Sequence, residues 1–335
     1  MNTVTSLIAV LLVVLSLSFA IVRNAYATPP IMYMIGVNKD GFHHGDAYLL
    51  KANDQTAMID VANYDSAKAL MIPFLRAKQI NTINKLFITH PHTDHYGGIM
   101  AIVEANIHVD TLYHNPLPNH ISDWNYKPEE YQAAIKLLTD NGTNIVDISR
   151  GDIIDFGKTQ FDVIYAEKAD NYEGRSIIVN DYSPLITWQV NGSRVLFTGD
   201  MEETGAVRLP EYLDIRADIV HMQHHGGYNV GNLDFYREVN ASLHLYSSTN
   251  QIYTLISGSA RSITRTLNSN YCHSGKHGTV KISFHSNNFE VESESGGCSQ
   301  TVLAKKFGEL EHQNPAISGH RISALPAIIS VLLNE

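Results

Sequence analysis

THPHTDHYGG, residues 89–98, is the most informative stretch of this 335-residue chain. Within it, six consecutive positions hold four side chains that can bind a metal: His90, His92, Asp94 and His95. Transition metals such as zinc take imidazole nitrogens and carboxylate oxygens, and a catalytic site leaves a coordination position open for water. The apolar run 84–89 comes just before these residues and reads as a strand. We therefore expect a metal site at a strand end.

The spacing of these side chains divides them into two pairs. Pro91 favours an extended backbone at His90, where residues two apart point the same way, so His90 and His92 can hold one ion. Asp94 and His95 would then face a second ion. A set of isolated surface histidines is the alternative, and four ligand-type side chains at this spacing argue against it.

Two later motifs have the same form as the first. Residues 195–200 read VLFTGD, an apolar run that ends in Asp200, and residues 217–227 read ADIVHMQHHGG, a run that ends in His224 and His225. The order HxHxDH, then TGD, then HHG resembles that of the metallo-β-lactamase superfamily of binuclear metallohydrolases.

Within that superfamily the chain is most similar to the branch of competence-type DNA-uptake hydrolase domains and phosphorylcholine esterases. The similarity rests on GDAYLL at 45–50, AMID at 57–60, the HHG ending and GTVKIS at 278–283, and it covers about residues 31–293. It implies an α/β fold, a four-layer αββα metallo-β-lactamase-like sandwich in which the ligand loops meet at one edge. These families usually have glycine where Ala62 stands, so that turn is expected to differ.

The resemblance also implies a ligand set. His90 and His92 would bind the first metal, Asp94 and His95 the second, and Asp200 would bridge the two. One of His224 and His225 would complete the second site, with His225 favoured, and the other would support the site or contact substrate. No motif supplies the usual third histidine of the first site. The nearest candidate is His114, followed by His108 and His120.

The expected cofactors are two divalent metal ions, Zn²⁺ by default, with Mn²⁺ or Fe as alternatives. Two such ions would share a water and convert it to a metal-bridging hydroxide at neutral pH. Asp94 would orient that hydroxide. His114, His224 and Tyr182 are the candidates for the acid that protonates the leaving group. Asp60 is expected to pack at a strand end or to support a ligand.

The function that follows is hydrolysis of phosphoester bonds, with phosphodiesters favoured by the branch. The alternative on the same metals is hydrolysis of a carboxylic ester, lactone or β-lactam. From other classes, the alternatives are an iron redox protein and a metal-binding module without turnover. A small-molecule or phosphoester substrate is the expected partner. A net charge of −10 and the lack of a dense Lys/Arg run disfavour extended nucleic-acid binding, and the oligomeric state stays open.

The ends of the chain differ from its centre. Leu7–Val22 is apolar and Ala25-Tyr-Ala27 suits cleavage before Thr28, so residues 1–27 are interpreted as a signal peptide, with an uncleaved membrane anchor as the alternative. The hydrolase domain would occupy residues 28–299, in the periplasm or outside the cell, and 300–335 would form a C-terminal tail. Cys272 and Cys298, the only cysteines, are either a disulfide or two free thiols.

Hydrophobic periodicity predicts alternating strands and helices. A helix is expected over 66–78, with Pro73 near its start or at a kink, and another over 127–141, opened by Pro128 and closed by Gly142. Asn191-Gly192 predicts a hairpin turn between strands 185–190 and 194–197. Strands are also expected at 31–37, 47–51, 56–61, 108–113, 144–148, 160–165, 219–222 and 242–246, and helices at 98–105, 233–239 and 258–267.

Overall fold

The computed structural model describes residues 28–37, 45–118, 120–168, 178–307 and 321–322. The expected signal peptide lies outside the described residues, as does most of the expected tail. Among the described residues no helix is long and apolar enough to cross a bilayer.

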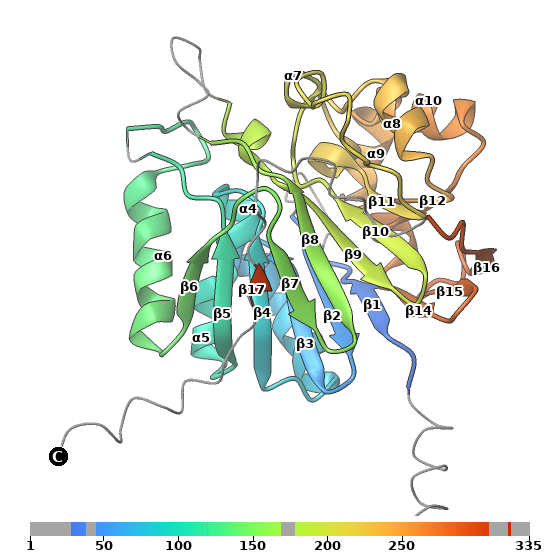
Figure 1. Cartoon of the computed structure of the whole chain (residues 1–335). Coiled ribbons are helices and arrows are strands. Elements are labelled where there is room, and N and C mark those ends of the chain that lie inside the picture. Colours follow the sequence, from blue (N-terminus) through green and yellow to red (C-terminus); the bar gives the residue numbers. More distant parts are fainter. Residues whose placement is uncertain (1–27, 38–44, 119, 169–177, 308–320, 323–335) are drawn as a thin grey trace, which may run out of the picture.

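Two mixed sheets form the centre of the molecule (Figure 1). The first sheet has the strand order β16-β15-β14-β1-β2-β3-β4-β5-β6. Its strands are β1 (Ile31–Met34), β2 (Ala47–Ala52), β3 (Gln55–Val61), β4 (Thr82–Ile88), β5 (His108–His114), β6 (Asn144–Asp147), β14 (Val280–Phe284), β15 (Asn288–Ser293) and β16 (Gln300–Leu303).

The second sheet has the order β13-β12-β11-β10-β9-β8-β7-β17. Its strands are β7 (Ile153–Phe156), β8 (Thr159–Tyr165), β9 (Leu185–Val190), β10 (Ser193–Phe197), β11 (Ile219–His221), β12 (Leu243–Tyr246), β13 (Asn270–His273) and β17 (Arg321–Ile322). Within each sheet the neighbours β3, β4, β5 and β6, and β10, β11, β12 and β13, run parallel.

Helices cover the outer faces of the sheets. The first half of the chain contributes α2 (Tyr64–Ser66), the π-helix η1 (Ala67–Met71), α3 (Ile72–Ala77), α4 (Thr93–Tyr96), α5 (Ile99–Glu104) and α6 (Pro128–Asp140). The second half contributes α7 (Glu203–Ala206), α8 (Leu233–Val239), α9 (Asn250–Leu255), α10 (Gly258–Thr266), α11 (Ser274–His277) and the 3-10 helices η3 (Val179–Tyr182) and η4 (Gln223–Gly226). Figure 1 shows α5 and α6 beside β5 and β6, and α8 and α10 near β11 and β12.

The core has three parts because each strand alternates its side chains between two faces. Met32, Leu50, Phe161 and Trp188 belong to the cluster that fills the space between the two sheets, and a second cluster joins the outer face of the first sheet to its helices. A third cluster does the same for the second sheet. The predicted α/β class and αββα layering are confirmed by this arrangement.

The predicted elements with clear periodicity match the structure closely. Strand 185–190 and helix 233–239 have the predicted bounds, and Asn191 and Gly192 both have positive φ, as the expected hairpin turn requires. Strands β7 and β13 and helix α9 were not predicted, because they are short runs that adopt their conformation through pairing and packing with the rest of the fold.

Pro73 divides the helix that was expected over 66–78. It stands second in α3, and the preceding turns form the π-helix η1. Proline lacks the N–H that an uninterrupted α-helix would donate, so the chain changes its hydrogen-bonding pattern just before it. The prediction of a proline near a helix start or kink agrees with this geometry.

The two cysteines form a disulfide between Cys272 and Cys298, whose Cα atoms lie 5.6 Å apart. Cys272 lies on β13, the edge of the second sheet, and Cys298 precedes β16, the edge of the first. The bond therefore ties the two sheets together at one side of the sandwich. Strand β16 pairs with β15, so the folded body continues past the domain boundary expected at residue 299.

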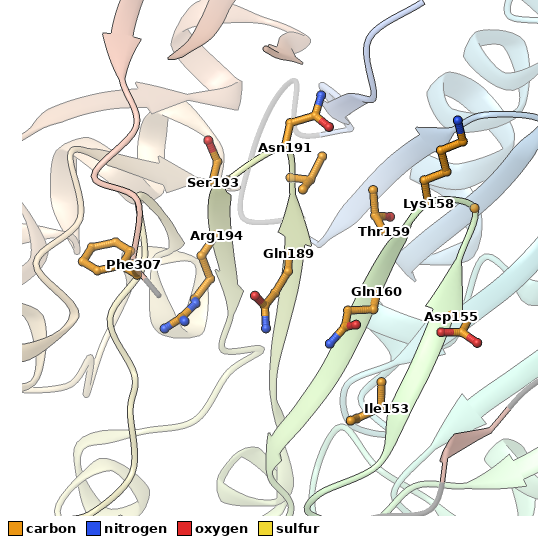
Figure 2. A pocket seen from close by; sticks show the side chains of 13 residues that line it. Ile153, Asp155, Lys158, Thr159, Gln160, Gln189, Asn191, Ser193, Arg194 and Phe307 are labelled. Carbon is orange, nitrogen blue, oxygen red and sulfur yellow. The ribbon is translucent and has the colours of Figure 1, made fainter. Parts of the chain in front are cut away.

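The second sheet carries a polar cavity of about 560 Å³. Figure 2 shows Gln160, Gln189 and Arg194, from the neighbouring strands β8, β9 and β10, facing this cavity, with Phe307 at its margin. Among the residues that the structure describes, its lining contains a single carboxylate, Asp155, and no histidine or cysteine. This cavity therefore lacks the donors that a transition-metal centre requires.

His244 on β12 gives stability a dependence on pH. Its side chain is fully buried beside the Tyr236 ring, and burial lowers the pKa of His244 to about 4. In the unfolded chain a histidine titrates near pH 6.5. Between about pH 6.5 and pH 4 the unfolded state therefore binds a proton that the folded state does not, and the free energy of unfolding falls as pH falls, by up to about 3 kcal/mol.

We predict that His244→Phe removes this contribution. Urea unfolding of both proteins at pH 7 and at pH 4.5 should show a smaller loss of stability on acidification in the variant. Equal losses in the two proteins would contradict the assignment to His244.

Candidate metal centre

Five strand ends bring the candidate ligands together. His90 follows β4, Asp200 follows β10, and His225 lies in η4 just after β11. Asp60 lies near the end of β3, and Asp46 directly precedes β2. Because carboxyl ends of neighbouring parallel strands meet at one edge of a sheet, β3 and β4 in one sheet and β10 and β11 in the other deliver these residues to the same region.

The residues predicted for the second metal converge on one point. Nε2 of His95 lies 3.2 Å from Oδ2 of Asp200 and 3.9 Å from Oδ2 of Asp94. Nε2 of His225 lies 3.3 Å from the same oxygen of Asp200 and 3.3 Å from that of Asp94. Two imidazole nitrogens thus face two carboxylates across a space of the size that a single cation needs.

The residues predicted for the first metal lie beside this group. Nε2 of His90 is 3.8 Å from Oδ2 of Asp200, and the rings of His90 and His92 are 4.7 Å apart. Nδ1 of His90 lies 3.3 Å from Oγ of Ser183, whose hydroxyl also accepts a hydrogen bond from the Asp200 backbone N–H at 3.0 Å. Oδ2 of Asp200 is therefore close to His90 as well as to His95 and His225, as expected for a bridging ligand.

Two carboxylates contact the Nδ1 atoms of His95 and His225. Oδ2 of Asp60 lies 2.8 Å from Nδ1 of His95, and Oδ1 of Asp46 lies 3.3 Å from Nδ1 of His225. Histidines that ligate a metal typically donate their other ring N–H to a carboxylate in this way, which fixes the tautomer and the ring orientation. Each ring consequently directs Nε2 toward Asp94 and Asp200.

Asp46 and His221 are functional candidates that the sequence did not assign. Oδ2 of Asp46 lies 2.9 Å from Nε2 of His221, and both side chains are buried. Asp46 stands in the GDAYLL motif, one of the motifs on which the family resemblance rests, so the motif was the signal available. Ligand-type atoms of Asp46, His95, Asp200 and His225 all lie within 4.8 Å of one another. Because Asp46 meets the Nδ1 side of the His225 ring, we assign it to orienting that ring.

Burial and charge set the protonation of this group. Burial alone would raise the pKa values of Asp46 and Asp200, but the surrounding histidines hold both well below the usual range. Burial alone would lower the pKa values of His95 and His225, but the facing carboxylates, Asp200 foremost, raise both well above the usual range. The pKa of His90 is held well below its usual value by burial and by His95. The buried carboxylates therefore attract positive charge, and the same field would attract a divalent cation.

The backbone at the site adopts conformations that most residues avoid. Asp60, Ala62, His224 and His225 all have φ between 48° and 58°. Such left-handed conformations cost energy in residues other than glycine and cluster at functional sites. The turn at Ala62 thus keeps the conformation that glycine favours, so its geometry does not depend on the missing glycine. At Gly98 a Cβ would lie 2.0 Å from the Val61 carbonyl oxygen, which explains the glycine there.

Residues 123–125 contact the HxHxDH motif through side-chain hydrogen bonds. Oδ2 of Asp123 lies 2.9 Å from Nε2 of His92, and Asn125 donates from Nδ2 to Oδ1 of Asp94 at 3.1 Å. Thr93 in turn donates to Oδ1 of Asn125 at 2.6 Å. Trp124, between these two contacts, is 88% exposed. This segment thus supports the motif with two side chains and presents an aromatic ring to solvent with the third.

The group opens into a cavity of about 280 Å³. Its lining is His92, Asp94, Trp124, Asn125, Asn180, Asp200, Glu202, His224, His225, Gly227, Tyr228, Ile252 and Ile256. His224, unlike the buried His225, is partly exposed in this wall, 3.9 Å from Asp200 and with Nδ1 2.9 Å from the Tyr228 carbonyl oxygen. His225 is thus buried with its Nε2 facing Asp94 and Asp200, whereas His224 is partly exposed in the cavity wall.

His114 does not reach this cavity. Its Nδ1 lies 3.1 Å from the Tyr131 hydroxyl of α6 and its Nε2 lies 3.2 Å from Asp147, because the ring packs beneath that helix. His108 pairs with Asp110 at the surface, and His120 is exposed. Tyr182 is buried and does not line the cavity. None of these residues is placed to complete the first metal site or to protonate a leaving group.

The donor set suits divalent cations. Imidazole nitrogens and carboxylate oxygens in this mixture are typical of zinc, manganese and iron sites. Nε2 of His90 and Oδ1 of Asp200 are buried and have no hydrogen-bond partner within the described part of the chain. Buried polar atoms are rarely left in that state, so their placement is consistent with ligation of a cation.

Comparisons with known proteins show similarity over part of the chain. Residues 40–167 match the model of the metallo-beta-lactamase superfamily. Over 166 residues, 49% of this chain, the sequence is 26% identical to ComE operon protein 3 of Bacillus subtilis (strain 168), and the match spans 20% of that protein. The chain thus spans about a fifth of the length of that relative.

The solved structures that align with this chain are distant in sequence. The metallo-beta-lactamase fold protein YhfI from Bacillus subtilis aligns with a TM-score of 0.50 at 11% identity, covering 75% of this chain and 99% of YhfI. A diphosphatase from the PhnP family aligns with a TM-score of 0.45 at 11% identity, covering 76% of this chain and 98% of that chain. The YhfI alignment supports the fold.

We predict that Asp60→Asn weakens metal binding by about 10–100-fold, the range typical when a carboxylate that orients a ligand is lost. Asparagine tolerates the positive φ at this position, and its oxygen can still accept from Thr89. Titration of Zn²⁺ against a chromophoric chelator measures the change. Asp218→Asn, which alters a buried carboxylate that accepts from the Arg194 and Lys305 backbones, is the matched control and should bind Zn²⁺ normally. Equal affinity in the Asp60 variant and the wild type would contradict the orienting role.

Proposed function

We propose that this chain, which is similar to the metallo-β-lactamase superfamily over residues 40–167, is a metal-dependent hydrolase that uses two divalent cations to cleave phosphoester bonds, with phosphodiesters as the favoured substrates. The observation that carries the proposal is the convergence of the His95 and His225 Nε2 atoms on Asp94 and Asp200, with Nε2 of His90 3.8 Å from the same oxygen of Asp200. This arrangement supports the binding of two adjacent cations.

Different residues of the chain would bind the cations, orient the attacking water and protonate the leaving group. When bound, two adjacent divalent cations acidify water and neutralise charge that develops on the reacting group. His90 and His92 would hold one cation, His95 and His225 the other, and Asp200 would contact both. Asp94, fixed by the Asn125 amide, would also orient the attacking water. His224 is the one candidate for the leaving-group acid that faces the cavity.

The charge of the cavity supports a phosphodiester over a phosphomonoester. No lysine or arginine lines the cavity among the described residues, and Glu202 adds a further negative charge to its wall. Any charge on the substrate would therefore have to be balanced by the cations. A phosphodiester carries one negative charge at the reacting group, whereas a phosphomonoester carries nearly two near neutral pH.

The apolar part of the cavity wall favours a second candidate function, hydrolysis of a carboxylic ester, lactone or β-lactam. Ile252 and Ile256 supply an apolar side, and Tyr228 at the rim is 64% exposed. An uncharged carboxylic ester, lactone or β-lactam would pack against such a wall without a charge to balance. The same cations would then polarise a carbonyl group instead of a phosphoryl group.

We also propose that the enzyme works outside the cytoplasm, in the periplasm or as a secreted protein. The apolar segment before residue 28 supports this location, and so does the disulfide between Cys272 and Cys298, because disulfides persist in oxidising compartments. A membrane-anchored form is the alternative if the segment is not removed. A small-molecule phosphoester is the proposed partner.

We predict that Asp94→Ala and Asp200→Ala each lower turnover by at least about 10²–10³-fold while the fold is kept. Hydrolysis of bis-p-nitrophenyl phosphate and of nitrocefin should be measured with metal content and circular dichroism. Asp234→Ala, at an exposed carboxylate on α8, is the control and should keep full turnover. Full turnover in either site variant would overturn the mechanism, and cleavage of nitrocefin alone would favour the second function.

A further inference from the structure

The proposed first metal site is one ligand short. His90, His92 and Asp200 are available to it. Among the described residues, the only other histidines in the cavity wall are His224 and His225, and His114 does not line the cavity. Asn180 does lie in that wall. It belongs to η3, in the interval between Gly98 and Asp200 where the usual third histidine is missing from the sequence.

The amide of Asn180 has a defined orientation. Its Nδ2 donates to Oε1 of Glu202 at 2.9 Å, and Oε2 of the same carboxylate accepts from Nδ2 of Asn229 at 3.0 Å. An ionised carboxylate only accepts hydrogen bonds, so the nitrogen of Asn180 must face Glu202 and the oxygen must face the other way. The identity of the two amide atoms therefore follows from the network.

The oxygen that results is buried and unsatisfied. Asn180 is 6% exposed, and its Oδ1 has no hydrogen-bond partner in the described part of the chain. An unpaired buried carbonyl oxygen costs about 1–3 kcal/mol, so such atoms usually have a partner outside the protein chain. The same cavity wall contains His92 and Asp200, two of the three ligands proposed above for the first cation.

The segment around Asn180 is held firmly beside that site. Asp181 accepts from the Glu202 backbone N–H at 3.0 Å and pairs with Arg208 at 3.0 Å. Ser183 contacts both His90 and the Asp200 backbone, as described above. An atom at position 180 is thus fixed relative to two of the proposed ligands.

We propose that Oδ1 of Asn180 is a ligand of the first cation, in place of the usual third histidine. The inference rests on the proposed two-cation function. An amide oxygen is a harder donor than an imidazole nitrogen and suits Mn²⁺ better than Zn²⁺. The first site should therefore discriminate less strongly in favour of Zn²⁺ than a site completed by histidine.

The test is metal binding by the full chain, measured with Zn²⁺ alone and with Mn²⁺ alone by competition with a chromophoric chelator. Asn180→Ala should weaken one of the two binding steps by at least about 10-fold and leave the other unchanged. Asn180→His should restore the weakened step and raise the preference for Zn²⁺ over Mn²⁺ above that of the wild type.

Asn229→Gly is the matched control. It removes the other amide that donates to Glu202, and glycine accepts the φ of 56° at that position without strain. If Asn180 acted only by holding Glu202, both variants would weaken binding. Weakening in Asn180→Ala alone supports ligation by Oδ1, whereas equal weakening in the two overturns it.

Two other outcomes separate this inference from the function on which it rests. A wild type that binds one cation or none would refute the two-cation function. A wild type and an Asn180→Ala variant that both bind two cations with equal affinities would refute only the role of Asn180. If circular dichroism shows that Asn180→Ala is unfolded, the Zn²⁺ to Mn²⁺ preference of Asn180→His decides, and an unchanged preference overturns the proposal.

Discussion

Burial of several carboxylates against histidines is the constraint on which the rest of the site depends. Asp46, Asp60 and Asp200 are almost fully removed from water, and charges in that state require partners. The partners are His95 and His225, each held between a carboxylate on its Nδ1 side and others on its Nε2 side. The left-handed backbone at Asp60 and at His225 is retained because it directs these side chains inward, so local strain is offset by the electrostatic gain of the whole group.

The layered architecture explains why the group forms where it does. One sheet supplies Asp60 and the HxHxDH motif, and the other supplies Asp200 and His225. Neither sheet alone contains a complete set of donors. The site is therefore a product of packing between the sheets, and the cluster of large apolar side chains between them, including Phe161 and Trp188, sets how closely the two sets of ligands approach.

Much of this could be predicted from the sequence, for physical reasons that differ between residues. His90, His92, Asp94 and His95 are close in the chain, so their spacing alone indicated a shared role. Asp200 and His225 could be predicted because each follows an apolar strand.

Asp46, His221 and Asp123 were not assigned, since their partners are distant in sequence and only the fold brings them together. Asn180 was overlooked because an asparagine carries no ligand signal until its burial and its hydrogen bonds are known. His114 was proposed as a ligand only because it is a histidine. The packing of helix α6 against its ring could not be predicted from the sequence around His114.

The disulfide between Cys272 and Cys298 has a mechanical consequence for this interface. It joins the edge of one sheet to the edge of the other, so the two halves stay linked even when no cation spans them. The covalent link therefore limits how far the two sheets can separate at that side.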